Sequence, residues 1–489
     1  MTAENLGASV AAPMEPRETE ADVVIVGSAL AGLVAGAILT RQGKRIVILE
    51  QTDTVGGRGG AVQRPDGYWI DFGHRDGHDV GDCQLAWHYG AEAAREAGVE
   101  VKLRRVEQPL RLHRFPEDRV LEGGRWGPEG FLAAAGEFFE CPVDGMAELG
   151  EIVGQLAGAG AAEQEAALPE TLGTWLPRHV RHPGVRRALL LMATVIFHRH
   201  PEEASVGRLM QFFRNPKGEG PFIPDDDEVG GMQGLMEPWA RAIRARGGEI
   251  ALGWKPVEIV IDGGRVRGGV AVDTTNLVRE VRAPIVISTY PVWETFDLAD
   301  EHLFPPAFVA AAHELRGHRA DLVGWQAGLG RVPIIRATGV PDRHGGWNRL
   351  LRGPERAYRG GYQITSLSSR RAAPPGKHLL MLVMARWFRG GSTAGQPWTA
   401  ARAELDEAID YLRRFYADLD ACVEWSAYQY VAAPQSTSWA WAPLRRHGLE
   451  APGIQGLLLA GSTLEAPAAV VDVGAYAGLA AARRALALL

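Results

Sequence analysis

Cysteine is scarce in this chain: three residues, Cys83, Cys141 and Cys422, occur among 489 and lie far apart. No two of them form a C-x-x-C pair. This spacing argues against a disulfide framework and against a zinc knuckle. We therefore expect no metal site and no disulfide-stabilised fold.

Long hydrophobic runs are also missing. The longest strongly apolar stretch, residues 188–197, has about half of the roughly 20 residues that a membrane-spanning helix needs. The first 20 residues carry acids and prolines and have no apolar core, unlike a secretory signal. We expect a flexible tail over residues 1–19, no transmembrane segment and a cytoplasmic location, and we leave a peripheral membrane contact open.

Neither sign of charge dominates. Lys and Arg number 52 against 59 Asp and Glu, a net charge of −7, which gives no electrostatic reason to expect a nucleic-acid partner. At 46% hydrophobic and 23% charged, the composition is that of a soluble globular protein. Because one core rarely exceeds about 250–300 residues, a chain of 489 is expected to form two domains or one domain with a large insertion.

The strongest pattern lies near the N-terminus. Residues 22–26 (DVVIV) form a β-branched strand signal, and a glycine-rich turn and a helical stretch follow over residues 27–41. A second apolar strand over residues 46–49 ends at Glu50. This order of strand, glycine turn, helix, strand and acid is typical of a dinucleotide-binding βαβ unit.

Each position of this unit has a chemical reason. Gly27 permits the tight turn, and the small Ala29, in place of the usual second glycine, lets the main chain approach a pyrophosphate. Gly32 allows close helix–strand packing, the helix start offers N–H groups to phosphates, and Glu50 can accept hydrogen bonds from a ribose diol. The candidate cofactor-binding residues here are Gly27, Ser28, Ala29, Gly32, Glu50 and Gln51.

Residues 52–58 (TDTVGGR) follow directly, and the whole run 22–58 resembles the FAD-binding segment of the phytoene desaturase and flavin-containing amine oxidase superfamily. The resemblance implies that Gly57 and Arg58 lie against the flavin and the phosphates. Two glycines let the main chain approach a flat ring, and an arginine neutralises phosphate charge.

The resemblance continues along the chain. Residues 67–74 are similar to the superfamily's D-x-G strand, and residues 230–235 to its later glycine unit. It implies that the backbone of Val257 contacts the adenine. Residues 373–378 (APPGKH) resemble an element of the phytoene desaturase branch, which we therefore favour.

Residues 456–462 (GLLLAGS) and 474–478 are similar to the closing motif of the superfamily. This implies that Gly461 and Ser462 lie at the flavin ribityl chain and that a helix N-terminus faces the isoalloxazine ring. Ser462 replaces the usual aspartate with a shorter, uncharged side chain, which affects cofactor affinity or geometry. Since no cysteine matches a covalent attachment pattern, we expect noncovalent FAD.

The predicted fold is therefore α/β, with an FAD-binding Rossmann-like domain and an inserted mixed α+β substrate domain. The segments 20–98, 228–300 and 450–489 are assigned to the discontinuous FAD domain, and 99–227 and 301–449 to the substrate domain.

Catalytic residues are harder to predict, because a flavin accepts hydride from a C–H bond held over its ring without an obligate base. His74 and His78, in the polar segment 74–79, are the candidates for acid–base or substrate-polarising work. Packing at the flavin edge or a solvated loop is the alternative. Metal binding is disfavoured, since the segment contains Gly77 and lacks a helix pattern.

No second glycine fingerprint follows a strand, so a nicotinamide site is unsupported. We expect an FAD-dependent oxidoreductase that abstracts hydride from a largely apolar, lipophilic substrate by desaturation or dehydrogenation, with electrons passing to oxygen or a quinone. An amine or amino-acid oxidase and a redox-neutral double-bond isomerase are the alternatives. Rab GDP-dissociation inhibitors share the fold without being FAD enzymes, but intact Glu50, Gly57 and Arg58 argue against such a binding protein. The oligomeric state stays open.

Overall fold

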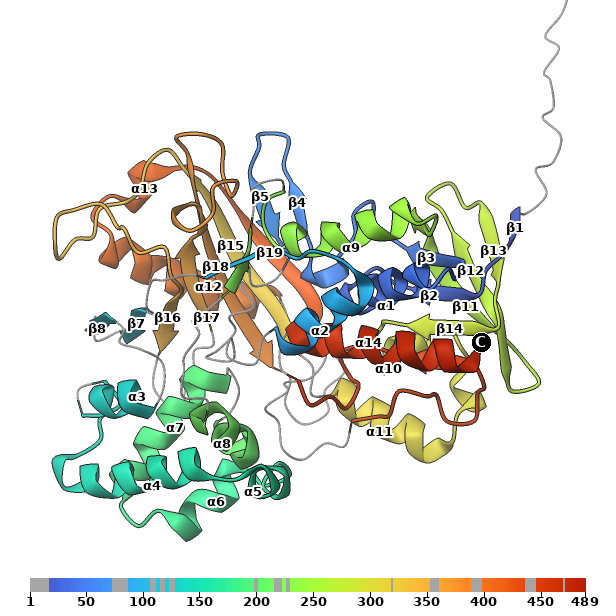
Figure 1. Ribbon diagram of the computed structural model, residues 1–489. Helices are drawn as coiled ribbons and strands as arrows, with labels where there is room; N and C mark the ends of the chain where they lie inside the picture. The colour runs from blue at the N-terminus through green and yellow to red at the C-terminus, as the bar shows by residue number, and fades with distance from the viewer. Residues whose placement is uncertain are drawn as a thin grey trace, which may run out of the picture.

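A computed structural model describes most of the chain, and two large sheets organise it (Figure 1). The described residues are 17–72, 87–105, 111–114, 119–122, 128–136, 138–197, 201–214, 222–225, 229–317, 320–351, 360–387, 398–435, 446–468 and 471–489.

A five-stranded parallel sheet forms the centre of one half of the molecule (Figure 1). Its inner strands are fully buried runs of valine, isoleucine and leucine, as expected for a parallel sheet covered on both faces. In spatial order the strands are β10 (Glu249–Leu252), β3 (Ile46–Glu50), β2 (Val23–Val26), β14 (Ile285–Ser288) and β20 (Leu457–Leu459). The structure therefore confirms the predicted α/β class.

Helices cover one face of this sheet. Gly478 of the last helix packs closely on the first, because a Cβ atom there would lie 2.4 Å from the carbonyl oxygen of Ala31. The covering helices are α1 (Leu30–Arg41), α2 (His88–Ala97), α9 (Gln233–Ala245) and α14 (Val471–Leu488).

A four-stranded sheet covers the opposite face, together with α10 (Val292–Thr295) and α11 (Pro306–Arg316). Its strands are, in order, β1 (Arg17–Glu20), β13 (Val278–Arg282), β12 (Arg265–Val272) and β11 (Lys255–Asp262). Strand β1 overlaps the end of the segment 1–19 that we predicted to be a flexible tail. Its sequence RETE has no apolar pattern, and it becomes a strand by pairing in parallel with the edge of β13.

A mixed sheet of seven strands organises the other half. One of its faces packs on α12 (Trp398–Phe415), with Val323 and Trp325 beside Leu405. Because side chains alternate along a strand, Leu322 points to the other face, where it joins a core formed largely by helices. The strands are, in order, β19 (Val423–Gln435), β15 (Ala320–Leu329), β18 (His378–Trp387), β17 (Gly360–Ile364), β16 (Asn348–Leu351), β7 (Arg111–Arg114) and β8 (Arg119–Glu122).

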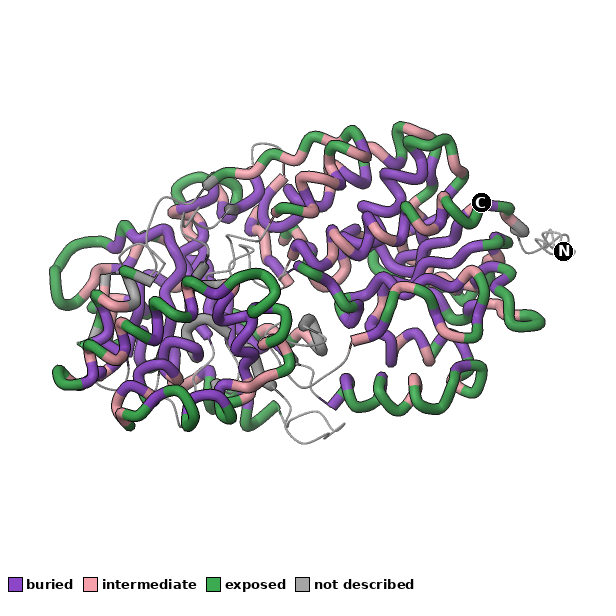
Figure 2. The backbone as a smooth tube through the Cα atoms, turned by 60° about the horizontal axis from the view of Figure 1, so that its bottom comes forward, coloured by how far each residue is buried: buried purple, intermediate pink, exposed green. Residues whose placement is uncertain are grey.

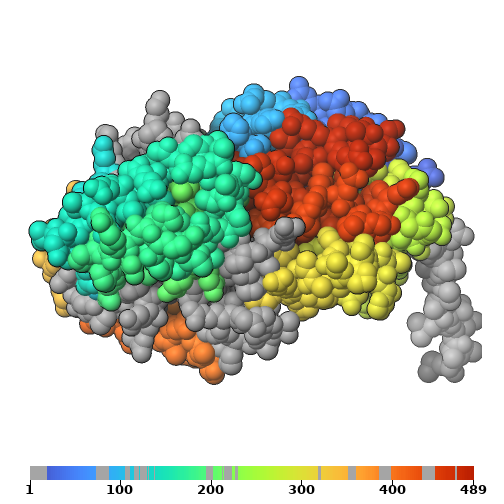
Figure 3. All heavy atoms as spheres, turned by 90° about the horizontal axis from the view of Figure 1, so that it is seen from below, coloured from blue at the N-terminus to red at the C-terminus, as the bar shows by residue number. Residues whose placement is uncertain are grey.

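A helical layer completes this half, and Figure 3 shows it at the end of the molecule away from α11. Its helices are α3 (Pro128–Ala134), α4 (Met146–Gly158), α5 (Ala161–Ala166), α6 (Leu172–His179), α7 (Pro183–Phe197) and α8 (Val206–Arg214). Buried residues gather in two masses, one around each large sheet (Figure 2). Within the described ranges, no helix combines the length and the apolar character needed to span a membrane.

Two short antiparallel pairs form separate two-stranded sheets. Strand β4 (Ala61–Gln63) pairs with β5 (Trp69–Asp71), and β6 (Leu103–Arg105) pairs with β9 (Phe222–Pro224). The α13 helix (Leu419–Cys422) leads directly into β19.

Candidate functional site

The glycine turn between β2 and α1 is tightly packed. Gly27 has φ +88°, a conformation that favours glycine, and a Cβ atom there would lie 2.5 Å from Thr289 Oγ1. A Cβ atom at Gly32 would lie 2.3 Å from the carbonyl oxygen of Gly27. Ala29 is the N-cap residue of helix α1, and its side chain forms no hydrogen bond with the helix. The first N–H groups of the helix are thus not capped by the Ala29 side chain.

Glu50 lies at the carboxyl end of β3 and is 4% exposed. Its Oε2 accepts hydrogen bonds from the N–H (2.8 Å) and the hydroxyl (2.6 Å) of Ser28. Its Oε1 accepts hydrogen bonds from the N–H (2.9 Å) and the hydroxyl (2.9 Å) of Thr52. Each carboxylate oxygen therefore receives one hydroxyl donor, the pattern that the two hydroxyls of a ribose would also present. The Thr52 hydroxyl has a second acceptor in Thr54 O at 2.7 Å, so it can turn away.

The turn that carries Gly57 and Arg58, the short helix η1 (Gly57–Gly59), lies beside this cradle. Gly57 has φ +53°, and a Cβ atom there would be 3.5 Å from the Ala29 Cβ. Arg58 forms an ion pair with Glu294 on α10, with Nη1 and Oε1 3.1 Å apart and both side chains 32% exposed. The structure thus brings Gly57 against the first turn and leaves Arg58 accessible.

Tyr290 and Glu294 are site residues that we missed in the sequence. Burial raises the pKa of the Tyr290 phenol, the negative charges of Glu50 and Glu294 raise it further, and Arg58 lowers it. The phenol therefore lies among the three charged groups of the site. A signal was present, since Tyr290 closely follows β14, and ligands of parallel sheets bind at the carboxyl ends of the strands.

Asp71 joins two segments that the resemblance singled out separately, residues 67–74 and 230–235. Its Oδ1 accepts a hydrogen bond of 2.7 Å from the N–H of Met232, just before α9. A Cβ atom at Gly231, where φ is +64°, would lie 2.4 Å from the same oxygen. The 2% exposed Asp71 therefore fixes the start of α9 against the β4–β5 pair.

Val257 lies on β11, at a bulge where the register against β12 shifts between Pro256 and Glu258. Its side chain is 38% exposed. The strand starts next to the cradle, because the N–H of Trp254 donates a hydrogen bond of 2.8 Å to Glu50 O. An irregular backbone at this exposed residue is compatible with the adenine contact that the resemblance implies.

Gly461 and Ser462 follow β20. A Cβ atom at Gly461 would lie 2.2 Å from the carbonyl oxygen of Tyr290, so the closing segment packs directly on the residues after β14. Ser462 is exposed, and the next residue, Thr463, is buried and lies 2.7 Å from His447 Nε2 through its hydroxyl.

The structure therefore brings most of the predicted residues to the carboxyl ends of β2, β3, β14 and β20. Gln51 is exposed beside the cradle. His74 and His78 lie outside the described residues. Among the residues that the structure describes, no three His, Cys, Asp or Glu side chains gather as a metal site.

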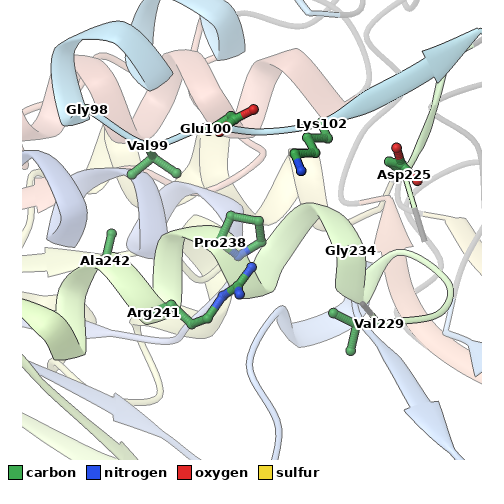
Figure 4. A pocket seen from close by; sticks show the side chains of 10 residues that line it. All are labelled: Gly98, Val99, Glu100, Lys102, Asp225, Val229, Gly234, Pro238, Arg241 and Ala242. Atoms are coloured by element: carbon green, nitrogen blue, oxygen red, sulfur yellow. The ribbon is translucent and has the colours of Figure 1, made fainter. Parts of the chain in front are cut away.

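A separate pocket of about 280 Å³ opens between residues 98–102 and α9 (Figure 4). Lys102 and Arg241 reach into it from opposite sides (Figure 4). None of the predicted cofactor-binding residues lines it. We therefore do not connect this pocket with the cofactor.

A model of the family described as flavin containing amine oxidoreductase matches residues 30–486. The chain belongs to this family. Membership confirms the predicted superfamily, the oxidoreductase class and FAD as the cofactor.

Solved structures agree on the fold. An oxidoreductase from Methanosarcina mazei has a TM-score of 0.67 at 18% identity, covering 94% of this chain and 99% of the other. Cyclohexylamine oxidase from Brevibacterium oxydans has a TM-score of 0.55 at 19% identity, covering 96% and 99%. In sequence, flavin-containing amine oxidase B from Cavia porcellus is 34% identical over 94 residues, and this match spans only 18% of each chain.

Replacing Glu50 with glutamine should weaken FAD binding by about ten- to a hundredfold, because an amide offers one acceptor oxygen where the cradle uses two. The N–H and hydroxyl donors of either Ser28 or Thr52 then face the amide N–H₂ group instead of an oxygen. The ribose also loses an anionic acceptor. Fluorescence titration of the apoprotein with FAD measures the change. Glu163→Gln, on the exposed α5, is the matched control and should bind FAD like the wild type.

Proposed function

We propose that this oxidoreductase abstracts hydride from a C–H bond of a largely apolar organic substrate and passes the electrons to dioxygen or a quinone. The observation that carries the proposal is the neutral face of the seven-stranded sheet beside η1. Strand β19 contacts η1. On β19 and its neighbours β15 and β18, the side chains on the sheet face away from α12 are uncharged. They include Leu322, Gln326, Leu379, Met381, Val383, Trp425, Ala427, Gln429 and Val431.

Leu322, Met381 and Val383 of this face are buried against the helical layer, so the face excludes water. A substrate at its edge beside η1 would be oriented without competing charges, which is what hydride transfer requires of a protein. When bound, FAD supplies the two-electron acceptor. The residues that would hold it are the N–H groups of the Gly27 turn and the α1 start for the phosphates, Glu50 for the ribose, and Val257 for the adenine. Gly57, Arg58, Gly461 and Ser462 would complete the site at the flavin.

The reaction has two candidate forms. Desaturation breaks two C–H bonds and forms C=C, and residues 373–378, which resemble the phytoene desaturase branch, favour it. Amine oxidation breaks one C–H bond next to nitrogen, and the nitrogen lone pair forms C=N as hydride leaves. The family description and the likeness to cyclohexylamine oxidase favour this second form.

A visible spectrum of the purified protein, with mass identification of the released cofactor, is the first test. We expect near-stoichiometric free FAD. Anaerobic bleaching on addition of apolar hydrocarbons, polyenes or amines would then support net oxidation, whereas substrate conversion without bleaching would support the isomerase alternative. A colourless protein that cannot be reconstituted with FAD would contradict the proposal.

A further inference from the structure

Tyr290 lies on the side of the glycine turn that faces away from Glu50. In the five-stranded sheet, β2 stands between β3 and β14, and the three strands run parallel. Glu50 ends β3, the turn at Gly27 follows β2, and Tyr290 closely follows β14. Neighbouring strands are about 4.8 Å apart, so a ligand that is held at Glu50 and crosses the turn comes next to Tyr290.

The Tyr290 ring packs on the turn itself. A Cβ atom at Gly27 would lie 3.1 Å from Tyr290 Cε1 and 3.4 Å from Tyr290 Cδ1. The main chain around Tyr290 is also held, because its carbonyl oxygen packs against Gly461 and the N–H of Val292 donates a hydrogen bond of 3.2 Å to Thr463 Oγ1. The ring is thus held beside the N–H groups that we assign to the pyrophosphate.

The Tyr290 hydroxyl is a donor that lacks an acceptor. Within the described ranges it forms no hydrogen bond, and the residue is half-buried rather than enclosed in the core. Burial and the negative charges of Glu50 and Glu294 raise the pKa of the phenol above its ordinary value, so the hydroxyl keeps its proton at physiological pH. A ligand that supplies an acceptor would satisfy this O–H.

The charges around the hydroxyl favour a neutral donor. Of the three charged groups near it, Glu50 and Glu294 are carboxylates, and Arg58 is ion-paired with Glu294 at 3.1 Å. A pyrophosphate adds further negative charge, so much of its stabilisation must come from N–H and O–H dipoles. Phosphate oxygens without a proton only accept hydrogen bonds, and the Tyr290 hydroxyl offers them a donor on the β14 side of the turn.

We propose that the Tyr290 hydroxyl donates a hydrogen bond to the pyrophosphate of FAD, which makes Tyr290 a further cofactor-binding residue. The inference rests on the cofactor site of the proposed function. It adds to that site a side-chain donor opposite Glu50. The pattern of the first βαβ unit does not contain this donor, because Tyr290 comes much later in the chain and only the pairing of β14 with β2 brings it to the turn.

Calorimetric titration of the apoprotein with FAD tests the inference in Tyr290→Phe, which keeps the ring on Gly27 and removes only the hydroxyl. We expect the dissociation constant to rise by about tenfold to a hundredfold, because the lost hydrogen bond has a charged acceptor. Tyr428→Phe is the matched control. The hydroxyl of Tyr428 donates to Asp406 on α12, away from the turn, so this variant should bind FAD like the wild type.

Phosphorus NMR of the FAD-saturated proteins separates a hydrogen bond from a packing effect. In Tyr290→Phe at least one resonance of the bound pyrophosphate should shift from its wild-type position, whereas in Tyr428→Phe neither should move. Unchanged FAD affinity in Tyr290→Phe, or weaker binding with both resonances unmoved, would overturn the inference while the proposed function stands. A wild-type protein that cannot be reconstituted with FAD would defeat both.

Discussion

Gly32→Ala is expected to lower FAD affinity by about a hundredfold or more and to destabilise the FAD-binding half. The added Cβ atom would lie 2.3 Å from the carbonyl oxygen of Gly27, 3.1 Å from Ile25 Cγ2 and 3.2 Å from Thr289 Cγ2. The first contact is with main chain, which a side-chain rotation cannot relieve. The Gly27 turn must therefore move, and with it the N–H groups that we assign to the pyrophosphate.

The flavin-to-protein ratio in the visible spectrum and the unfolding temperature measure this effect, and Gly32→Trp should remove FAD entirely. Gly154→Ala on α4 is the control, since nothing lies within 4 Å of its added Cβ atom. It should retain FAD and gain about 0.5–1 kcal/mol in the free energy of unfolding. A Gly32→Trp protein with full flavin would mean that this turn does not bind the cofactor.

The first βαβ unit could be predicted because its determinants are local. Gly27, Gly32 and Glu50 lie within one strand–turn–helix–strand segment, and each residue type is required by the turn, by the packing or by the ligand. The superfamily resemblance extended this prediction to distant segments, and the contact of Asp71 with Met232 shows two of those segments meeting.

The remainder of the site depends on long-range register, which a single sequence does not specify. The Arg58–Glu294 pair joins residues 236 positions apart. The neutral face of the seven-stranded sheet requires the pairing of β19, β15 and β18, and a slip of one residue in a strand would turn its side chains to the α12 face. Neither pattern is visible in a window of adjacent residues.

A buried polar cluster under α12 was missed for the same reason. Arg111 on β7 forms a buried ion pair with Asp342, with Nη1 and Oδ2 2.9 Å apart. His113, also on β7, lies 2.8 Å from the hydroxyl of Tyr411 and 3.1 Å from Asn348 Oδ1. Strand β7 pairs in parallel with β16, far along the chain, so only the tertiary fold brings these partners together.

Acidification from pH 7.5 to pH 5 should strongly destabilise the protein, because three histidines are buried in the neutral form. Burial lowers the pKa of His113 from 6.5 to about 3, and those of His344 and His447 to about 4. For His113, nearby Arg111 and His344 also lower it, while Asn348 and Asp342 oppose the shift. The unfolded chain takes up a proton at each of these residues below about pH 6.5, whereas the folded chain does not until about pH 3–4.

The stability from neutral burial is therefore fully present above pH 6.5 and is lost as the pH falls. Each histidine contributes a loss of about 1.4 kcal/mol per pH unit in this window, so three give about 6 kcal/mol at pH 5. That is comparable with the whole stability of many domains, about 5–15 kcal/mol. Asp342 does not share the window: burial raises its pKa, but the hydrogen bond and charge of Arg111 outweigh this and hold it below the usual value, so its contribution is lost only at lower pH.

Thermal unfolding at half-unit pH steps between 7.5 and 5 measures the slope. Replacing His113 with glutamine should lower stability at pH 7.5, since the contacts with Tyr411 and Asn348 change, yet remove about a third of the pH dependence because an amide does not titrate. The exposed His302→Gln is the matched control and should leave the slope unchanged. A His113→Gln protein with the wild-type slope would show that His113 does not resist protonation in the folded state, and that the acid response comes from other groups.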